Sequence, residues 1–216
     1  MNYASEKHLE EFVTACHRVA SFGLVRCSGG NLSWRVNEEH MLITATRSWM
    51  AEITREQIAV CRISDSTVLN DKKPSAENGF HFGILRERSD VNVVLHFQSP
   101  FATAVACCGR DHKDFFVIPE IPYYIGPIAV VPYLNPGSNE LAQGVVSAMK
   151  EHDLVILKNH GQVTVGKNFD DVIQKACFFE LACEIILRAG NKIQFLSEDA
   201  IAYLRPQDEG KHYGTV

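Results

Sequence analysis

Apolar and polar positions follow helical and strand-like patterns in turn along the first third of the chain. Apolar side chains recur at helical spacing from Leu9 to Ala20, and Gly23 follows as a stop. Residues 54–57 have the spacing of a capping box, which marks a helix start. Short apolar runs predict strands near residues 31–36, 40–45 and 58–63. The pattern therefore predicts one helix followed by several strands.

The middle of the chain continues this alternation. Val93–Gln98 is an apolar run that predicts a buried strand. Ser75 is a candidate N-cap for a helix over residues 76–88. Ser99 and Pro100 predict the N-cap and first position of a second helix, which ends at Cys108.

The last third of the chain predicts two helices and a strand pair. Residues 138–152 and residues 169–189 have helical patterns, and Gly190 closes the second helix. Residues 153–160 and 162–167 predict two strands joined by a tight turn at His160 and Gly161.

These elements alternate without the strict βαβ rhythm of a dinucleotide-binding fold. They predict an α/β domain with a mixed, largely antiparallel sheet covered by helices. With 216 residues and 46% hydrophobic content, the chain is expected to form a single domain over residues 1–216. The pattern alone does not determine the topology.

Composition excludes several classes of function. The net charge of -5, the pI of about 6.0 and the absence of a Lys/Arg cluster argue against nucleic-acid binding. The start has no signal-peptide pattern, and no apolar segment approaches the roughly 20 residues that cross a bilayer. The seven cysteines are odd in number and lack a C-x-x-C pair. We therefore expect reduced thiols and a cytoplasmic protein that does not bind membranes.

Two apolar runs end in histidine, and these ends carry the candidate chemistry. Residues two apart in a strand share a face, so His96 and Gln98 are expected to project side by side. His160 ends the second run. The spacing by itself leaves a metal site and ordinary packing equally open. The other histidines, at positions 8, 17, 40, 81, 112, 152 and 212, are interpreted as surface or packing residues.

Glu77 is a candidate general base. Acidic residues are common in the first turn of a helix because the positive end of the helix dipole favours them. If the helix start lies beside the histidines, however, a partly buried carboxylate would gain basicity.

Three short segments could bind an anion. Residues 28–31 are small enough for their backbone N–H groups to converge, residues 44–48 add hydroxyls and Arg47, and Ser75 lies at a helix start. Each segment is weak evidence alone. Together with a metal site they suggest a small phosphorylated substrate.

In this order, the motifs resemble the class II aldolase/adducin family over essentially the whole chain, and most closely its members that cleave L-fuculose 1-phosphate. The motifs are residues 30–33, 73–77, 94–98, 159–161 and 211–214. The resemblance implies a three-layer α/β/α domain, a homotetramer with active sites at subunit interfaces, and a zinc ion held at three positions. Those positions fall on His96, Gln98 and His160, and the acid/base glutamate falls on Glu77.

The resemblance also implies further site residues. Phosphate binding falls on Asn31, Thr46 and Ser75, with Gly30 shaping the loop. A tyrosine supplied by the neighbouring subunit corresponds to Tyr123, and a C-terminal tyrosine to Tyr213.

Three positions depart from the family pattern. Gln98 replaces a histidine, and a neutral amide is a weaker ligand. Ala76 replaces a second serine and removes a hydroxyl. Arg47 replaces a glycine, which either adds charge to a phosphate pocket or crowds it.

The implied activity is reversible cleavage of a ketose 1-phosphate into dihydroxyacetone phosphate and an aldehyde, which is L-lactaldehyde for fuculose 1-phosphate. Pentulose-5-phosphate epimerases and a sugar-phosphate dehydratase share the family's site layout. A non-catalytic adducin-like scaffold is a further alternative, which Gln98 favours and the retained Glu77 opposes. A Schiff-base aldolase would use Lys158, although an exposed edge position is favoured for that lysine.

Overall fold

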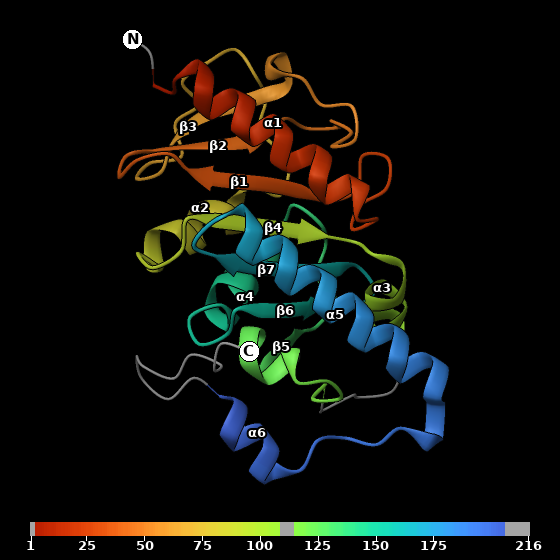
Figure 1. Cartoon of the computed structure of the whole chain (residues 1–216). Coiled ribbons are helices and arrows are strands. Elements are labelled where there is room, and N and C mark those ends of the chain that lie inside the picture. Colours follow the sequence, from red (N-terminus) through yellow and green to blue (C-terminus); the bar gives the residue numbers. More distant parts are fainter. Residues whose placement is uncertain (1–2, 109–114, 206–216) are drawn as a thin grey trace.

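A seven-stranded mixed sheet forms the centre of the molecule (Figure 1). The computed structural model describes residues 3–108 and 115–205. The strand order is β3-β2-β1-β4-β7-β6-β5, in which β5 and β6 are parallel and the other neighbours antiparallel. The strands are β1 Asn31–Arg35, β2 His40–Thr44, β3 Ile58–Arg62, β4 Val93–Phe97, β5 Ile128–Val131, β6 Leu154–Leu157 and β7 Gly161–Gly166. The expected mixed, largely antiparallel sheet is confirmed.

Helices cover both faces of this sheet and create the three layers. The helices are α1 Glu6–Ser21, α2 Asn78–Glu87, α3 Pro100–Cys107, α4 Asn139–Ala148, α5 Phe169–Ala189 and α6 Glu198–Leu204, with short turns η1 Arg55–Gln57, η2 Ile121–Ile125 and η3 Gly190–Lys192. Helices α1 and α5 cross the near face in Figure 1, and α2 and α4 lie behind. One hydrophobic core joins the sheet to α1, α3 and α5, and a second joins it to α2 and α4.

The longest helix follows the sequence pattern over its whole length. Asn168 caps α5 by accepting a hydrogen bond from the backbone of Asp171, and Gly190 ends it with a φ of 56°. That left-handed backbone favours glycine. Helix α1 likewise begins at a capping serine, Ser5.

Several predicted boundaries were wrong. The helix predicted over residues 76–88 begins at Asn78, because Ala76 and Glu77 form a turn in which the Glu77 amide donates to Ser75 Oγ. The helix predicted to reach residue 152 ends at Ala148. The two strands predicted to end in polar residues stop earlier, at Phe97 and Leu157. Strand β5, turn η2 and helix α6 were not predicted.

Strand β4 lies in the middle of the sheet and assembles the candidate site. Asn31 of β1 pairs with His96, and Gln162 of β7 pairs with the next residue, Phe97. Segments from three distant parts of the chain therefore meet at the end of β4.

The helix after β4 is capped from outside. Ser99 occupies the predicted N-cap position of α3, but its side chain makes no cap hydrogen bond. Glu180 of α5 does so instead: its carboxylate accepts from the backbone amides of Phe101 at 2.9 Å and Ala102 at 2.7 Å. The Ser99 hydroxyl also donates to Glu180, at 2.6 Å. A carboxylate from another helix thus satisfies amides that α3 leaves unpaired.

The opposite end of the sheet carries a charge network. Asp153 contacts Arg88 at 3.0 Å and the buried Lys175 at 2.9 Å. Lys175 also lies 3.3 Å from Asp171. These pairs connect α5 on one face to the end of α2 on the other.

The cysteines are free thiols, as expected. Burial raises the pKa of the Cys61 thiol to about 12, so this thiol is a poor nucleophile. Within the described ranges, the helices are all too short or too polar to cross a membrane.

Candidate functional site

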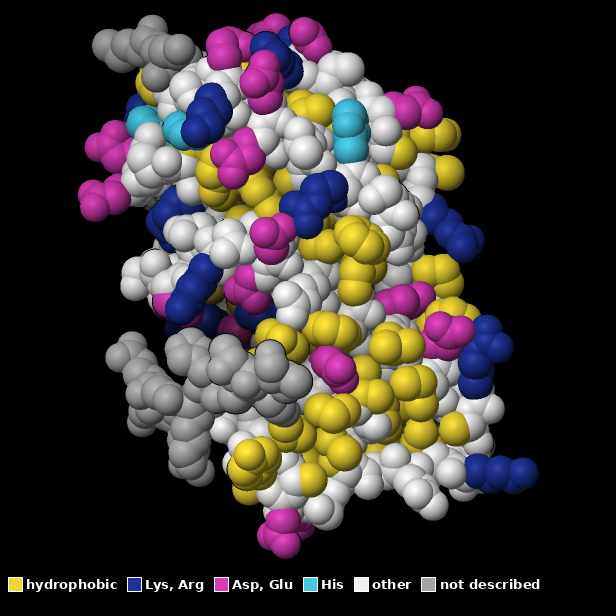
Figure 2. All heavy atoms as spheres, in the orientation of Figure 1, with side chains coloured by type: hydrophobic (Ala, Val, Ile, Leu, Met, Phe, Trp, Pro, Cys, Tyr) yellow, Lys and Arg dark blue, Asp and Glu magenta, His cyan; other side chains and the backbone are white. Residues whose placement is uncertain are grey.

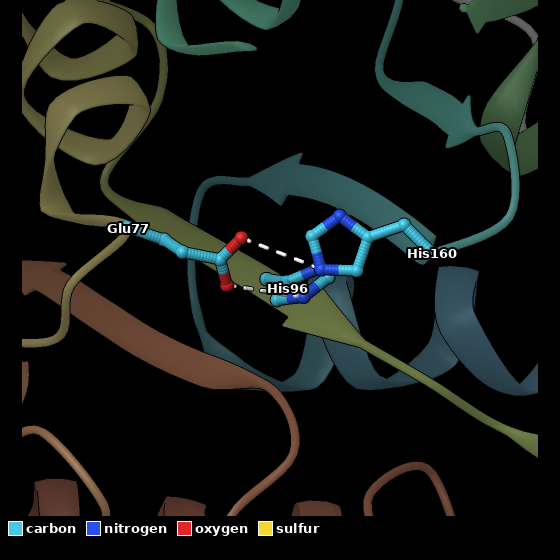
Figure 3. Close-up of side chains that lie close together, drawn as sticks. All are labelled: Glu77, His96 and His160. Atoms are coloured by element: carbon cyan, nitrogen blue, oxygen red, sulfur yellow. Dashed lines mark ion pairs between the residues drawn. The ribbon is translucent and has the colours of Figure 1, made fainter. Parts of the chain in front are cut away.

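Glu77, His96 and His160 form a compact cluster (Figure 3). One oxygen of Glu77, Oε2, lies 3.3 Å from His96 Nε2, and the other, Oε1, lies 3.4 Å from His160 Nε2. His96 is fully buried, while the side chains of Glu77 and His160 are 12% and 10% exposed. The carboxylate therefore lies between two imidazoles at the edge of the interior.

Local structure fixes each imidazole. His96 Nδ1 lies 2.8 Å from the backbone carbonyl of Gln162, which only accepts, so Nδ1 carries the proton. The lone pair of Nε2 consequently faces Glu77. His160 occupies the turn between β6 and β7, where Asn159 has a left-handed φ of 56°. The predicted turn at His160 is confirmed.

The chemistry of this cluster fits a divalent metal ion. Glu77 Oε1 and His96 Nε2 are buried and have no hydrogen-bond partner among the residues that the structure describes. Burial, with a smaller effect of His96, lowers the pKa of His160 against the opposing effect of Glu77. Two neutral imidazoles and a carboxylate form a typical zinc donor set, and their ligand atoms lie within 4.8 Å of one another. The Glu77 carboxylate therefore has the chemistry of a metal ligand as well as that of a base.

Gln98 lies beside this cluster, just beyond the end of β4. A Cβ atom placed on Gly161 would lie 2.8 Å from Gln98 Cγ and 3.1 Å from His96 Cε1. The two side chains therefore share a side of the turn, and glycine is needed where they meet. The Gln98 Oε1 atom lies against Gly29, where an added Cβ would approach to 2.5 Å. Coordination by Gln98 stays a prediction.

A buried chain of polar side chains reaches Glu77 from the other direction. Asn31 Nδ2 donates to Glu77 Oε2 at 3.0 Å, and Asn31 Oδ1 faces His81 Nε2. The Nδ1 atom of His81 lies 2.7 Å from Ser33 Oγ. Sequence reasoning missed Ser33 and assigned His81 to packing. Two sequence features could have indicated this chain: Asn31 and Ser33 are polar residues two apart on β1, and His81 follows Glu77 by about one helical turn.

The predicted phosphate loops meet next to Glu77. Ala45 and Pro74 form an isolated bridge, and the Thr46 amide donates to the carbonyl of Lys73, two residues before Ser75. Gly30 has a φ of 77°, and a Cβ there would lie 2.7 Å from the His96 carbonyl oxygen. Backbone conformation and close approach therefore both require glycine.

Arg47 adopts a left-handed φ of 63°, which explains why glycine suits this position. Its side chain is exposed and lines a hollow of about 260 Å³ with Trp49, Glu52 and Gln57. That hollow does not include the Glu77 cluster.

Of the two predicted tyrosines, Tyr123 lies away from the cluster. Tyr123 lies on η2 and lines a separate hollow of about 370 Å³ with Tyr124. Tyr213 lies outside the described residues. Lys158, the alternative Schiff-base lysine, is exposed, as favoured from its sequence position.

Comparison with known proteins gives the family. The model of the class II aldolase and adducin N-terminal domain matches residues 10–187. A 3-oxo-tetronate 4-phosphate decarboxylase of Pectobacterium atrosepticum is 32% identical over 187 residues, which cover 84% of this chain and 85% of the relative. An L-fuculose phosphate aldolase of Methanococcus maripaludis is 33% identical over 168 residues, covering 78% and 89%.

A solved structure has the same fold. The crystal structure of YgbL from Klebsiella pneumoniae, described as a candidate aldolase, epimerase or decarboxylase, superposes with a TM-score of 0.86. The two chains are 26% identical, and the match covers 94% of this chain and 100% of the other. Sequence and structure agree that the chain belongs to the class II aldolase and adducin family.

Proposed function

We propose that this protein is a metal-dependent lyase that releases dihydroxyacetone phosphate from a phosphorylated sugar, with L-fuculose 1-phosphate as the expected substrate and L-lactaldehyde as the second product. The observation that carries the proposal is the Glu77 carboxylate held between His96 Nε2 and His160 Nε2. This arrangement places a carboxylate, which can accept a proton, beside two imidazole nitrogens that can bind a metal ion. A non-catalytic scaffold would have no use for such an arrangement.

Each group of site residues has its own role in the proposed reaction. A zinc ion held by His96 and His160, with Gln98 as the predicted third ligand, would supply positive charge next to the ketone oxygen. Glu77 holds or returns the proton at the triose carbon whose bond to the aldehyde breaks. Thr46, Ser75 and Arg47 bind the phosphate together with the loop at Gly30 and Asn31, while the Asn31 side chain is held by Glu77 and His81. A tyrosine, Tyr123 of a neighbouring subunit or Tyr213, moves the proton on the aldehyde oxygen.

A second substrate is favoured by the likeness to the decarboxylase of Pectobacterium atrosepticum. In 3-oxo-tetronate 4-phosphate, loss of carbon dioxide leaves the same enediolate of dihydroxyacetone phosphate that retro-aldol cleavage leaves. Glu77 would return a proton to the same carbon in both reactions. The two activities therefore differ in the leaving group and not in the charge that must be stabilised.

We further propose a zinc-containing homotetramer that works in the cytoplasm. Seven free cysteines, three of them buried, support a reducing compartment. Apolar side chains gather in the lower half of Figure 2, where Figure 1 shows α5 and α6. In the same part of the chain, Tyr124 on η2, Leu181 on α5 and Phe195 between η3 and α6 are each about two-fifths exposed. Apolar surface of this kind is typical of a subunit interface.

One assay separates the two substrates. Both release dihydroxyacetone phosphate, which a coupled reductase detects, whereas only the decarboxylation releases carbon dioxide. Glu77→Gln keeps the size of the side chain but removes the base, and we expect turnover to fall at least about 100-fold. A chelator should abolish activity and zinc should restore it. Turnover by metal-free protein, or near-normal turnover by Glu77→Gln, would contradict the proposal.

A further inference from the structure

Three side chains link the interior of the α2 layer to the Glu77 carboxylate. Ser33 and Asn31 lie two residues apart on β1 and share a face, and His81 of α2 lies across both of them. Ser33 and His81 are fully buried, and Asn31 is 4% exposed. Buried polar groups need partners: Asn31 and His81 each have one on either side, and Ser33 pairs with His81.

The direction of every hydrogen bond follows from the carboxylate. A carboxylate only accepts, so Asn31 must present its NH2 group to Glu77 and its carbonyl oxygen to His81. His81 Nε2 must then be the donor. In a neutral ring Nδ1 is consequently an acceptor, and it must receive its proton from the Ser33 hydroxyl.

The environment of His81 supports a neutral ring. Burial, with a smaller effect of His96, lowers the pKa of His81 to about 3. The ring also stacks on Phe80 with 4.7 Å between centroids, which restricts its rotation. A neutral, fixed imidazole can hold one tautomer, and a hydroxyl on one side decides which.

We propose that His81 and Ser33 are a positioning pair for Glu77: Ser33 selects the Nε2–H tautomer of His81, and that tautomer turns the Asn31 amide so that its NH2 group faces the carboxylate. An Asn31 amide turned the other way would present a carbonyl oxygen to Glu77 and repel it. The pair thus acts through Asn31 and touches no substrate. The expected effect on catalysis rests on the proposed function, but the tautomer of His81 and the orientation of Asn31 do not.

The structural test is the tautomer of His81, read from the nitrogen chemical shifts of the imidazole in labelled wild-type protein. We expect protonated Nε2 and unprotonated Nδ1 at neutral pH. In Ser33→Ala, Nδ1 has no donor facing it, and we expect a mixture of tautomers. Protonated Nδ1 in the wild type would overturn the proposal whatever reaction the protein catalyses.

The kinetic test compares His81→Leu, which removes the donor, with His81→Gln, whose amide can still donate to Asn31. Loss of a side chain that orients a site residue typically costs about 10- to 100-fold in activity. We expect that loss in kcat for His81→Leu, KM and bound metal within about threefold of wild type, and recovery of most of kcat in His81→Gln. Phe82→Leu, a buried change on the same helix, controls for altered packing.

Each outcome has one meaning. Wild-type kcat in His81→Leu would overturn the positioning role. Equal losses in His81→Leu, His81→Gln and Phe82→Leu would show that only packing matters, and would also overturn it. If the wild type cleaves neither sugar phosphate, the proposed function fails, while the tautomer measurement still decides whether the pair exists.

Discussion

The carboxylate of Glu180 offers a quantitative test of how the site is supported. It accepts three hydrogen bonds at the start of α3, directly after Gln98, from the Ser99 hydroxyl and the amides of Phe101 and Ala102. Ser99 and Ala102 are fully buried, so water cannot readily replace the carboxylate. Glu180→Ala should therefore leave donors of α3 without partners.

The expected cost can be estimated donor by donor. A buried donor left without a partner costs about 1–3 kcal/mol. With two backbone amides affected, we expect Glu180→Ala to lower the free energy of unfolding by about 4 kcal/mol. Glu180→Gln keeps one acceptor oxygen, so about half that loss should remain. Ser99→Ala removes one donor from a carboxylate that keeps two others and should cost about 1 kcal/mol.

Urea denaturation followed by circular dichroism, at one fixed protein concentration, measures these differences. Glu184→Ala is the matched control, because Glu184 is on the same helix but pairs with the exposed Arg188, and its loss should cost less than about 0.5 kcal/mol. A loss below about 1 kcal/mol in Glu180→Ala, or equal losses in Glu180→Ala and Glu184→Ala, would refute the capping argument.

Three further predictions follow from other parts of the structure. Gln98→Ala should weaken zinc binding and Gln98→His should strengthen it, as isothermal titration would show; unchanged affinity in Gln98→Ala would exclude Gln98 as a ligand. Asp153→Asn removes a negative charge that pairs with the buried Lys175 ammonium, and it should lower the free energy of unfolding by about 3 kcal/mol in urea denaturation. Lys175→Met should cost only about 1 kcal/mol, because Asp153 is one-third exposed and stays paired with Arg88. In the unfolded chain His81 takes up a proton below its usual pKa of 6.5, whereas in the folded protein it does so only near 3. The free energy of unfolding should therefore fall as the pH falls between these values, by about 3 kcal/mol at pH 4.5. His81→Gln should lack this pH-dependent loss of stability.

The sequence predicted best those elements whose boundaries are set by nearby residues. Helix α5 runs from Phe169 to Ala189 as predicted, because an asparagine cap and a closing glycine act locally. Strand β5 was missed because Ile128–Val131 has only four residues and no alternation.

In the candidate site, too, the residues with a local sequence signal were predicted and those that depend on tertiary contacts were not. His96 and His160 could be selected because each ends an apolar run, and Glu77 because it lies next to a predicted helix start. The family resemblance then assigned the roles of these residues. The cap of α3 was assigned to Ser99, because the true acceptor, Glu180, is 81 residues away and only the tertiary fold brings it there. The role of His81 depends on two residues of β1, and no pattern on its own helix indicates it.

The central place of β4 in the sheet also has a consequence for folding kinetics. Its two neighbours, β1 and β7, come from segments far before and far after it in the chain, so both ladders close long loops. Long-range pairing of this kind slows folding relative to helical proteins of similar size. His96 and His160 can approach each other only after the second ladder has formed. A coordinating ion would therefore bind late and would slow unfolding more than it speeds folding.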